Sequence, residues 1–242
     1  MTNDMKIILL AIMLLFGAMG FRAYEIATAQ TTPQIVDNGG FTKTQVFLPA
    51  LTELNNGFLV PLYVEIKPGA GKILVNIDNP SFIVDTQQSV RKAVEQAASL
   101  TNTDLSGVDV IFSMSTQGDT VVSGPSAGAA MSVALSSILL QRHIKPGVII
   151  TGQILDNGKI GIVGGIIEKL RAAEKGNMSM MLVPPGELVT EEPIQECTEK
   201  SSTGYVERRC TVSYRKAGVA EQTSINVKEV STLQEAIDLM LE

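Results

Sequence analysis

The stretch Ser123-Gly124-Pro125-Ser126-Ala127-Gly128 places a serine hydroxyl between two glycines, directly before an apolar run that continues to about Leu140. Proline is favoured in the first turn of a helix, so a helix is predicted to begin at or beside Ser126. Glycines let a substrate backbone approach closely, and unpaired N–H groups at a helix N-terminus can donate to a developing oxyanion. The stretch therefore predicts a nucleophile where a loop meets a helix.

A serine hydroxyl is a poor nucleophile unless a base lies within hydrogen-bond reach. His143 is the single histidine and falls just beyond the predicted helix, roughly 25 Å from Ser126 by helical rise. Cys197 and Cys210 lie in a separate polar segment, so a Cys/His pair is not favoured either. Lys169 lies in a mostly apolar helix, where burial lowers the pKa of the amine until its neutral form can accept a proton. Lys169 is the predicted base.

These motifs resemble the proteolytic domain of Lon proteases. That family carries its nucleophile in a G-P-S-A-G element, here Gly124 to Gly128, and its lysine in a G-G-x-x-x-K element, here Gly164 to Lys169. The separation of Ser126 from Lys169 matches the family. Thr151 matches the threonine of a T-G element whose hydroxyl helps hold the lysine. The resemblance implies that Gly124, Pro125 and Gly128 support the site. Two cysteines and one histidine cannot build a zinc site of the usual spacings, so neither a metal nor a cofactor is expected.

The chain departs from the family pattern at two positions. Ser123 stands where an acidic residue is common, which bears on the polarity and regulation of the site. Gln153 follows the T-G element, where the family often has Glu or Ser. Lon proteases usually also carry an ATPase, and this sequence contains no G-x-x-x-x-G-K-[ST] motif. The expected substrates are therefore peptides, unstructured segments or the tails of membrane proteins, cleaved without ATP hydrolysis.

Hydrophobic periodicity predicts an α+β fold with helices packed on mixed sheets. Residues 59–67 and 72–77 are predicted to form a hairpin around the turn Pro68-Gly69-Ala70-Gly71. The other predicted strands cover residues 108–114, 148–154, 160–163, 180–183 and 225–230, and the predicted helices cover residues 86–100, 125–140, 165–175 and 232–241. Residues 30–57 are interpreted as a linker, and residues 58–242 as a peptidase domain with an insertion at 186–223.

The first 29 residues are predicted to be a signal peptide or a membrane anchor. An apolar run follows Lys6 from Ile7 to Phe21, and Ala27-Thr28-Ala29 resembles a cleavage site. The run is shorter than the roughly 18 to 20 residues of a spanning helix, which favours cleavage. The catalytic domain is thus expected outside the cytoplasm, secreted or anchored to the membrane, where Cys197 and Cys210 can form a disulfide.

Composition limits the remaining functional classes. The 242 residues are 45% hydrophobic with a formal net charge of -6 and scattered basic residues, which argues against a nucleic-acid partner. The family resemblance implies a homo-oligomer, with a hexamer as the usual form. Two alternatives stay open: a catalytically silent domain that binds peptides or scaffolds an assembly, and a small-molecule kinase whose glycine-rich loop holds phosphate.

Overall fold

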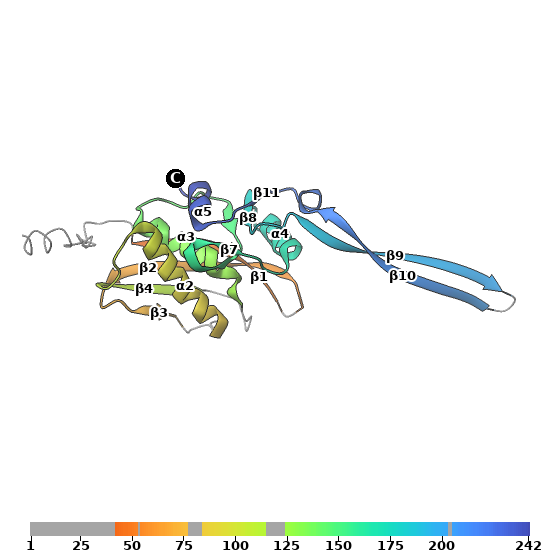
Figure 1. Ribbon diagram of the computed structural model, residues 1–242, viewed down its shortest axis with the longest axis horizontal. Helices are drawn as coiled ribbons and strands as arrows, with labels where there is room; N and C mark the ends of the chain where they lie inside the picture. Colours follow the sequence, from red (N-terminus) through yellow and green to blue (C-terminus); the bar gives the residue numbers. More distant parts are fainter. Residues whose placement is uncertain (1–41, 53, 77–83, 115–123, 203–204) are drawn as a thin grey trace, which may run out of the picture. The chain divides into compact units, whose positions relative to one another are not determined.

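A computed structural model describes residues 42–52, 54–76, 84–114, 124–202 and 205–242 of the chain (Figure 1). The chain divides into two units, Met1–Gln34 and Ile35–Glu242, and only the second contains described residues. No helix in the described ranges is both long and apolar enough to cross a membrane. The predicted signal peptide or anchor at residues 1–29 lies outside the described residues.

The larger sheet has the order β1-β2-β4-β3, with β3 parallel to β4 and the other pairs antiparallel. Its strands are β1 (Lys43–Leu51), β2 (Gly57–Pro68), β3 (Ile73–Val75) and β4 (Val108–Met114). On β2 every second side chain is buried, which gives the sheet one core-facing surface. The apolar residues of that surface are Val60, Leu62, Val64 and Ile66.

The predicted hairpin between β2 and β3 is wrong, because both strands pair with β4 rather than with each other. The turn between them is bound to β4: Asp109 Oδ1 accepts hydrogen bonds from the backbone N–H groups of Ala70 and Lys72, both at 2.9 Å. The Gly69 N–H donates to the Gly107 carbonyl. These contacts give the turn a partner outside the two strands that it joins, and β4 inserts between them.

The linker predicted at residues 30–57 is also wrong in part, because β1 lies within it. Thr44, Val46 and Leu48 are buried and alternate with exposed residues, and β1 pairs with β2 along its whole length. Threonine and glutamine in this stretch concealed a short period-2 pattern that buries one face of the strand. The folded domain therefore begins before residue 58.

The second sheet is parallel and has the order β11-β8-β5. It contains β5 (Val148–Ile150), β8 (Met180–Val183) and β11 (Asn226–Glu229). The strand predicted at residues 148–154 is interrupted at Thr151 and Gly152, after which β6 (Gln153–Ile154) pairs antiparallel with β7 (Ile160–Gly161). The interruption arises because the Gly152 N–H donates to Ser126 O instead of to a neighbouring strand.

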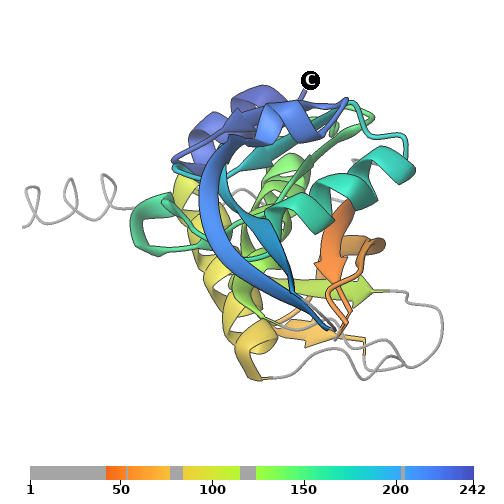
Figure 2. The ribbon, with the colours of Figure 1, turned by 90° about the vertical axis from the view of Figure 1, so that its right-hand side faces the viewer.

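Four helices pack around these sheets: α2 (Val84–Thr101), α3 (Gly128–Leu139), α4 (Ile166–Lys175) and α5 (Leu233–Met240). The central helix α3 packs against α2, α5, β1 and β2, and its residues from Gly128 to Ile138 are buried. Helix α4 packs on β1 and β2 and shares a second hydrophobic cluster with β8. In Figure 2 the two blue strands, residues 189–202 and 205–218, point toward the viewer, and these helices lie behind them. The predicted α+β fold is confirmed.

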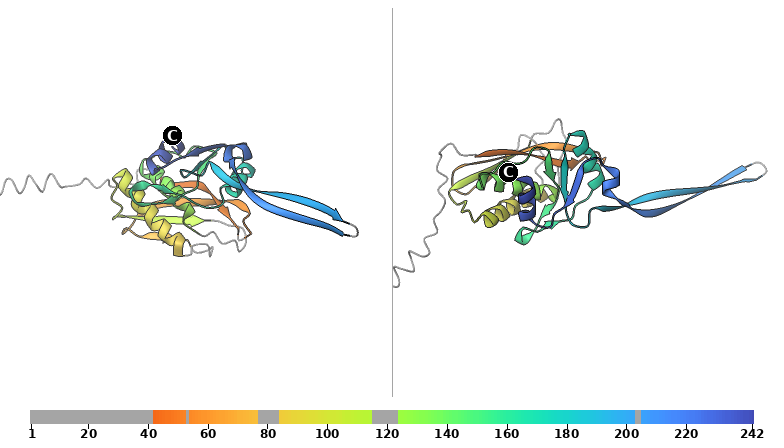
Figure 3. Two further views of the ribbon diagram at one scale, coloured as in Figure 1. Left: turned by 45° about the vertical axis from the view of Figure 1, so that its right-hand side comes forward. Right: turned by 90° about the horizontal axis from the view of Figure 1, so that it is seen from above.

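Residues 186–223, predicted to be an insertion, contain a long antiparallel hairpin of β9 (Val189–Ser202) and β10 (Tyr205–Gly218), followed by η3 (Val219–Gln222). Almost all side chains described on β10 are exposed, and the hairpin extends from the rest of the domain (Figure 3). Cys197 and Cys210 face each other across it and form a disulfide, as predicted. The two strands therefore pair with each other and do not pack against a shared hydrophobic core.

Candidate active site

Ser126 lies in a single turn of 3-10 helix, η1 (Pro125–Ala127), which leads directly into α3. Gly124 caps this turn with φ 94° and ψ 170°, a backbone region that is essentially restricted to glycine. Pro125 occupies the first position of the turn, where its fixed φ suits a helix start. The sequence Gly-Pro-Ser thus sets a sharp bend that leaves the Ser126 side chain half-buried.

Two backbone hydrogen bonds hold this turn against the chain between β5 and β6. The Gly152 N–H donates to Ser126 O at 2.9 Å, and the Ala129 N–H donates to Gly152 O at 3.0 Å. Gly128 permits this approach, because a Cβ atom there would lie 2.9 Å from the backbone nitrogen of Ile154. Ser126 is therefore fixed relative to Thr151, the residue that precedes Gly152.

Lys169 projects from the first turns of α4 and is only 3% exposed. Its Nζ donates a hydrogen bond to Thr151 Oγ1 at 3.2 Å, and Thr151 itself is completely buried. The Thr151 N–H donates to Leu182 O, so the second sheet holds the threonine that contacts the lysine. Thr151 thus links the lysine to the strand that also anchors the serine turn.

The buried position changes the acidity of the Lys169 amine. Burial lowers its pKa from 10.5 to about 8, and the negative charge of the Glu187 carboxylate opposes part of this shift. Glu187 also accepts a hydrogen bond from the Val163 N–H at 3.3 Å, which ties the start of the predicted insertion to the loop before α4. At mildly alkaline pH a substantial fraction of Lys169 is neutral and can accept a proton.

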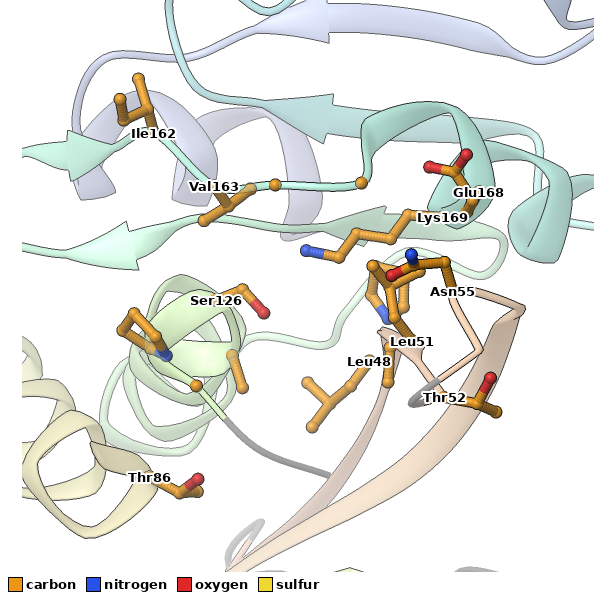
Figure 4. Close-up of a pocket in the computed structure, with 17 residues that line it drawn as sticks. Leu48, Leu51, Thr52, Asn55, Thr86, Ser126, Ile162, Val163, Glu168 and Lys169 are labelled. Atoms are coloured by element: carbon orange, nitrogen blue, oxygen red, sulfur yellow. The ribbon is translucent and has the colours of Figure 1, made fainter. Parts of the chain in front are cut away.

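Ser126 and Lys169 line the same pocket, which has a volume of about 760 Å³. Figure 4 shows their side chains pointing toward one another across part of this space. Gly124 and Pro125 line the pocket too, whereas Thr151 and Gly128 do not. The other lining residues are Leu48, Pro49, Ala50, Leu51, Thr52, Asn55, Thr86, Ala127, Ile162, Val163, Gly164, Gly165 and Glu168.

Sequence reasoning missed two residues of this region, Glu187 and Thr86. Glu187 belongs to a stretch that looked like a charged insertion, and Thr86 looked like an ordinary helix-start residue. His143 is exposed beyond the C-terminal end of α3, as expected for a surface histidine. Ser123, one of the two departures from the Lon pattern, lies outside the described residues, while Gln153 is half-buried at the start of β6.

A serine hydroxyl and a buried lysine amine lie in one pocket of this α+β domain. The protein thus falls in the class whose candidate nucleophile is a hydroxyl and whose candidate base is an amine. Residues 76–201 match the family described as the Lon protease (S16) C-terminal proteolytic domain. The match covers more than half of the chain, and the chain belongs to this family.

Individual relatives agree with this assignment. The chain is 28% identical over 168 residues to a Lon protease of Vibrio parahaemolyticus, which covers 69% of this chain and 20% of that protein. A Lon protease of Haemophilus influenzae is 27% identical over 187 residues, which is 74% of this chain and 21% of the relative. A peroxisomal Lon protease homolog 2 of Eremothecium gossypii is 52% identical over 63 residues, 26% of this chain and 6% of that protein. The chain thus spans about a fifth of the bacterial relatives' length.

Proposed function

We propose that the chain is a serine peptidase in which Ser126 is the nucleophile and Lys169 is its base. The observation that carries the proposal is the Lys169 amine: it is buried, bonded to Thr151, lowered in pKa to about 8, and in one pocket with the Ser126 side chain. A helix lysine without a catalytic role usually keeps its ammonium group in water, because burying a charge is costly. Membership in the Lon proteolytic-domain family supports the same assignment.

In the proposed reaction the neutral Lys169 amine accepts the Ser126 hydroxyl proton while Oγ attacks the carbonyl carbon of a peptide bond. Backbone N–H groups at Ser126 and its neighbours stabilise the oxyanion. The tetrahedral intermediate collapses, the C–N bond breaks, and the Lys169 ammonium gives its proton to the leaving nitrogen. Water then attacks the acyl ester, Lys169 accepts its proton, and that proton returns to Ser126 Oγ as the ester breaks.

Thr151 is proposed to be a positioning residue. Its hydroxyl lies 3.2 Å from Lys169 Nζ, and its backbone is bonded to β8, so it restricts the amine to a narrow set of positions. Gly124, Pro125 and Gly128 are proposed to shape the turn that presents Ser126. These roles follow from contacts of the individual residues and are independent of which polypeptide is cleaved.

The test compares covalent labelling and peptide cleavage in wild type, Ser126→Ala, Lys169→Met and Lys175→Met. A serine-reactive acylating probe is expected to label wild type at Ser126, and both the Ser126 and the Lys169 variants should lose labelling and cleavage. Lys175 ends the same helix and is exposed, so Lys175→Met controls for the loss of one positive charge. A folded wild type that is not labelled supports a catalytically silent binding domain instead.

We further propose that cleavage by this chain proceeds without nucleotide on unstructured polypeptides, outside the cytoplasm. The absence of a P-loop motif from the 242 residues supports the first part, and the apolar run before residue 22 together with the disulfide supports the second. Equal cleavage of an unfolded substrate with and without ATP is the expected result. To test the location, cells are fractionated before and after removal of the outer envelope, and labelling identifies the fraction that contains the intact protein.

A homo-oligomer, with a hexamer as the family form, is the remaining part of the proposal. Sedimentation of the purified chain across a concentration series is the direct measurement. A single monomeric species at the concentrations where peptide cleavage is observed contradicts it.

A further inference from the structure

Thr86 is a buried residue of the candidate site to which the proposed reaction assigns no role. It lies in the first turn of α2, is 1% exposed, and lines the same pocket as Ser126 and Lys169. Its Oγ1 atom has no hydrogen-bond partner within the part of the chain that the structure describes. A buried hydroxyl without a partner costs free energy, so its presence at a ligand-sized pocket calls for an explanation.

The surroundings of Thr86 indicate what kind of group would satisfy it. Figure 4 shows the Thr86 side chain on the opposite side of the pocket from Lys169. The pocket walls also carry the aliphatic side chains of Leu48, Ala50 and Ala127. A ligand side chain that enters here meets apolar groups along its length, and its tip faces the part of the wall that Thr86 contributes.

We infer that Thr86 is a specificity-determining residue that binds the polar tip of a substrate side chain with an aliphatic stem. Glutamine has this shape: its methylene groups suit the apolar walls, and its amide can both donate to and accept from a hydroxyl. Methionine has a similar length but no strong hydrogen-bonding group, so it leaves Oγ1 unpaired. The inference rests on the proposed function, because it takes the ligand of the pocket to be a polypeptide.

Ser136 provides a matched comparison within the same protein. It is the other described residue whose buried side-chain oxygen has no partner, but it lies in α3 and does not line the pocket. Loss of its hydroxyl removes an unpaired buried group without changing the surface that a substrate meets. If Thr86 variants change the substrate preference and Ser136→Ala does not, the change arises from the pocket.

The experiment uses pairs of unstructured peptides in which each position in turn carries glutamine or methionine. Affinities are measured with the Ser126→Ala protein, which keeps the pocket and removes the proposed chemistry, and cleavage is measured with Ser126 present. At one position the glutamine peptide is expected to bind about fivefold tighter, the usual size of one neutral hydrogen bond. Thr86→Val, nearly the same shape, should abolish or reverse that preference, whereas Thr86→Ser and Ser136→Ala should keep it.

Thermal unfolding shows whether each variant is folded, and Thr86→Val should be at least as stable as the parent because it loses an unpaired hydroxyl. The absence of a glutamine preference at every position, or a preference that survives in Thr86→Val, overturns the inference. Failure of the proposed function has a different signature: wild type would not be acylated at Ser126, while the affinities of the Ser126→Ala series would still decide the role of Thr86.

Discussion

Lys169 carries its amine in an environment that disfavours charge, and this has a measurable energetic cost. In the unfolded chain its pKa is near 10.5, and in the folded protein it is about 8, so the unfolded state binds more protons between these values and stability rises with pH there. Below pH 8 the full cost is present, at most about 3 kcal/mol.

We therefore predict that Lys169→Met is more stable than wild type at neutral pH. Its advantage should shrink as pH rises through the interval from 8 to 10.5, because the wild-type amine becomes neutral in both states. Urea unfolding of both proteins across this interval measures the difference, with exposed Lys175→Met as control. Two stability curves that stay parallel would show that the Lys169 amine is not perturbed.

Glu187 gives a second prediction at the scale of single residues. Its carboxylate raises the pKa of Lys169 against the effect of burial, so Glu187→Gln should lower that pKa further. The acid limb of the pH profile of kcat/KM then moves to lower pH, while the side-chain carbonyl of the introduced amide can still accept the Val163 N–H. Glu191→Gln removes the same charge from an exposed position on β9 and should leave the limb in place. If the acid limb of Glu187→Gln stays where it is in wild type, the Glu187 carboxylate does not influence the pKa of the proposed base, Lys169.

The sequence predicted Ser126, Lys169 and Thr151 because each lies in a short motif with its own local signal. The structure brings all three to one region, although they come from η1, α4 and the chain after β5. Glu187 and Thr86 had no such signal. Their importance depends on which side chains lie next to them after folding, and spacing along the chain does not contain that information.

At the scale of elements, the junction of η1, α3 and β6 depends on close backbone packing at Gly128. A Cβ atom there would lie 2.8 Å from Ile154 Cγ2 and 2.9 Å from the Ile154 backbone nitrogen. Gly128→Ala is therefore expected to destabilise the protein by about 1 to 3 kcal/mol, the typical cost of overpacking, and to reduce Ser126 labelling by displacing the serine turn. Chemical denaturation and labelling rates measure the two effects.

Gly107→Ala is the control for this substitution, because a Cβ atom at Gly107 meets nothing within 4 Å among the described residues. Its stability and labelling rate should stay close to those of wild type. If both alanine variants behave alike, the packing between α3 and β6 tolerates the added methyl group and does not position Ser126.

Local patterns predicted most elements but not how they pair. The amphipathic helix at α2 and the buried strand β4 followed directly from their hydrophobic periods. The prediction that β2 and β3 pair with each other was wrong, because the Asp109 side chain and the Gly107 carbonyl bind the connecting turn. These are interactions between residues distant in the sequence. Strand β1 was missed because its polar residues resemble a linker unless the strand that it pairs with is known.

At the scale of the whole molecule, the β9–β10 hairpin stands apart from the hydrophobic cores. Val206, Val212 and Tyr214 are 63%, 57% and 68% exposed, and neither core cluster includes any described residue of β9 or β10. A two-stranded hairpin is only marginally stable by itself, and a disulfide typically contributes about 2 to 4 kcal/mol by restricting the unfolded chain. The Cys197–Cys210 bond is expected to stabilise the hairpin locally.

We predict that the double variant Cys197→Ser, Cys210→Ser keeps the main thermal transition of wild type and loses protection of the hairpin. Limited trypsin digestion should cut it after Lys200, Arg208 or Arg209 much faster than wild type, while the remaining domain stays resistant. Wild type in reducing buffer should behave as the double variant does. A fall in the main transition of several degrees would instead mean that the hairpin and the cores unfold together.

The hydrogen bond from Gly152 to Ser126 O joins the serine turn to the residue beside Thr151. The Gly152 amide proton can exchange with deuterated solvent only when that bond opens. Its exchange rate therefore reports how readily the turn that carries Ser126 separates from the segment that carries Thr151, the hydrogen-bond partner of Lys169. The exchange of this single backbone proton therefore measures the integrity of the site, and it can be followed without any substrate.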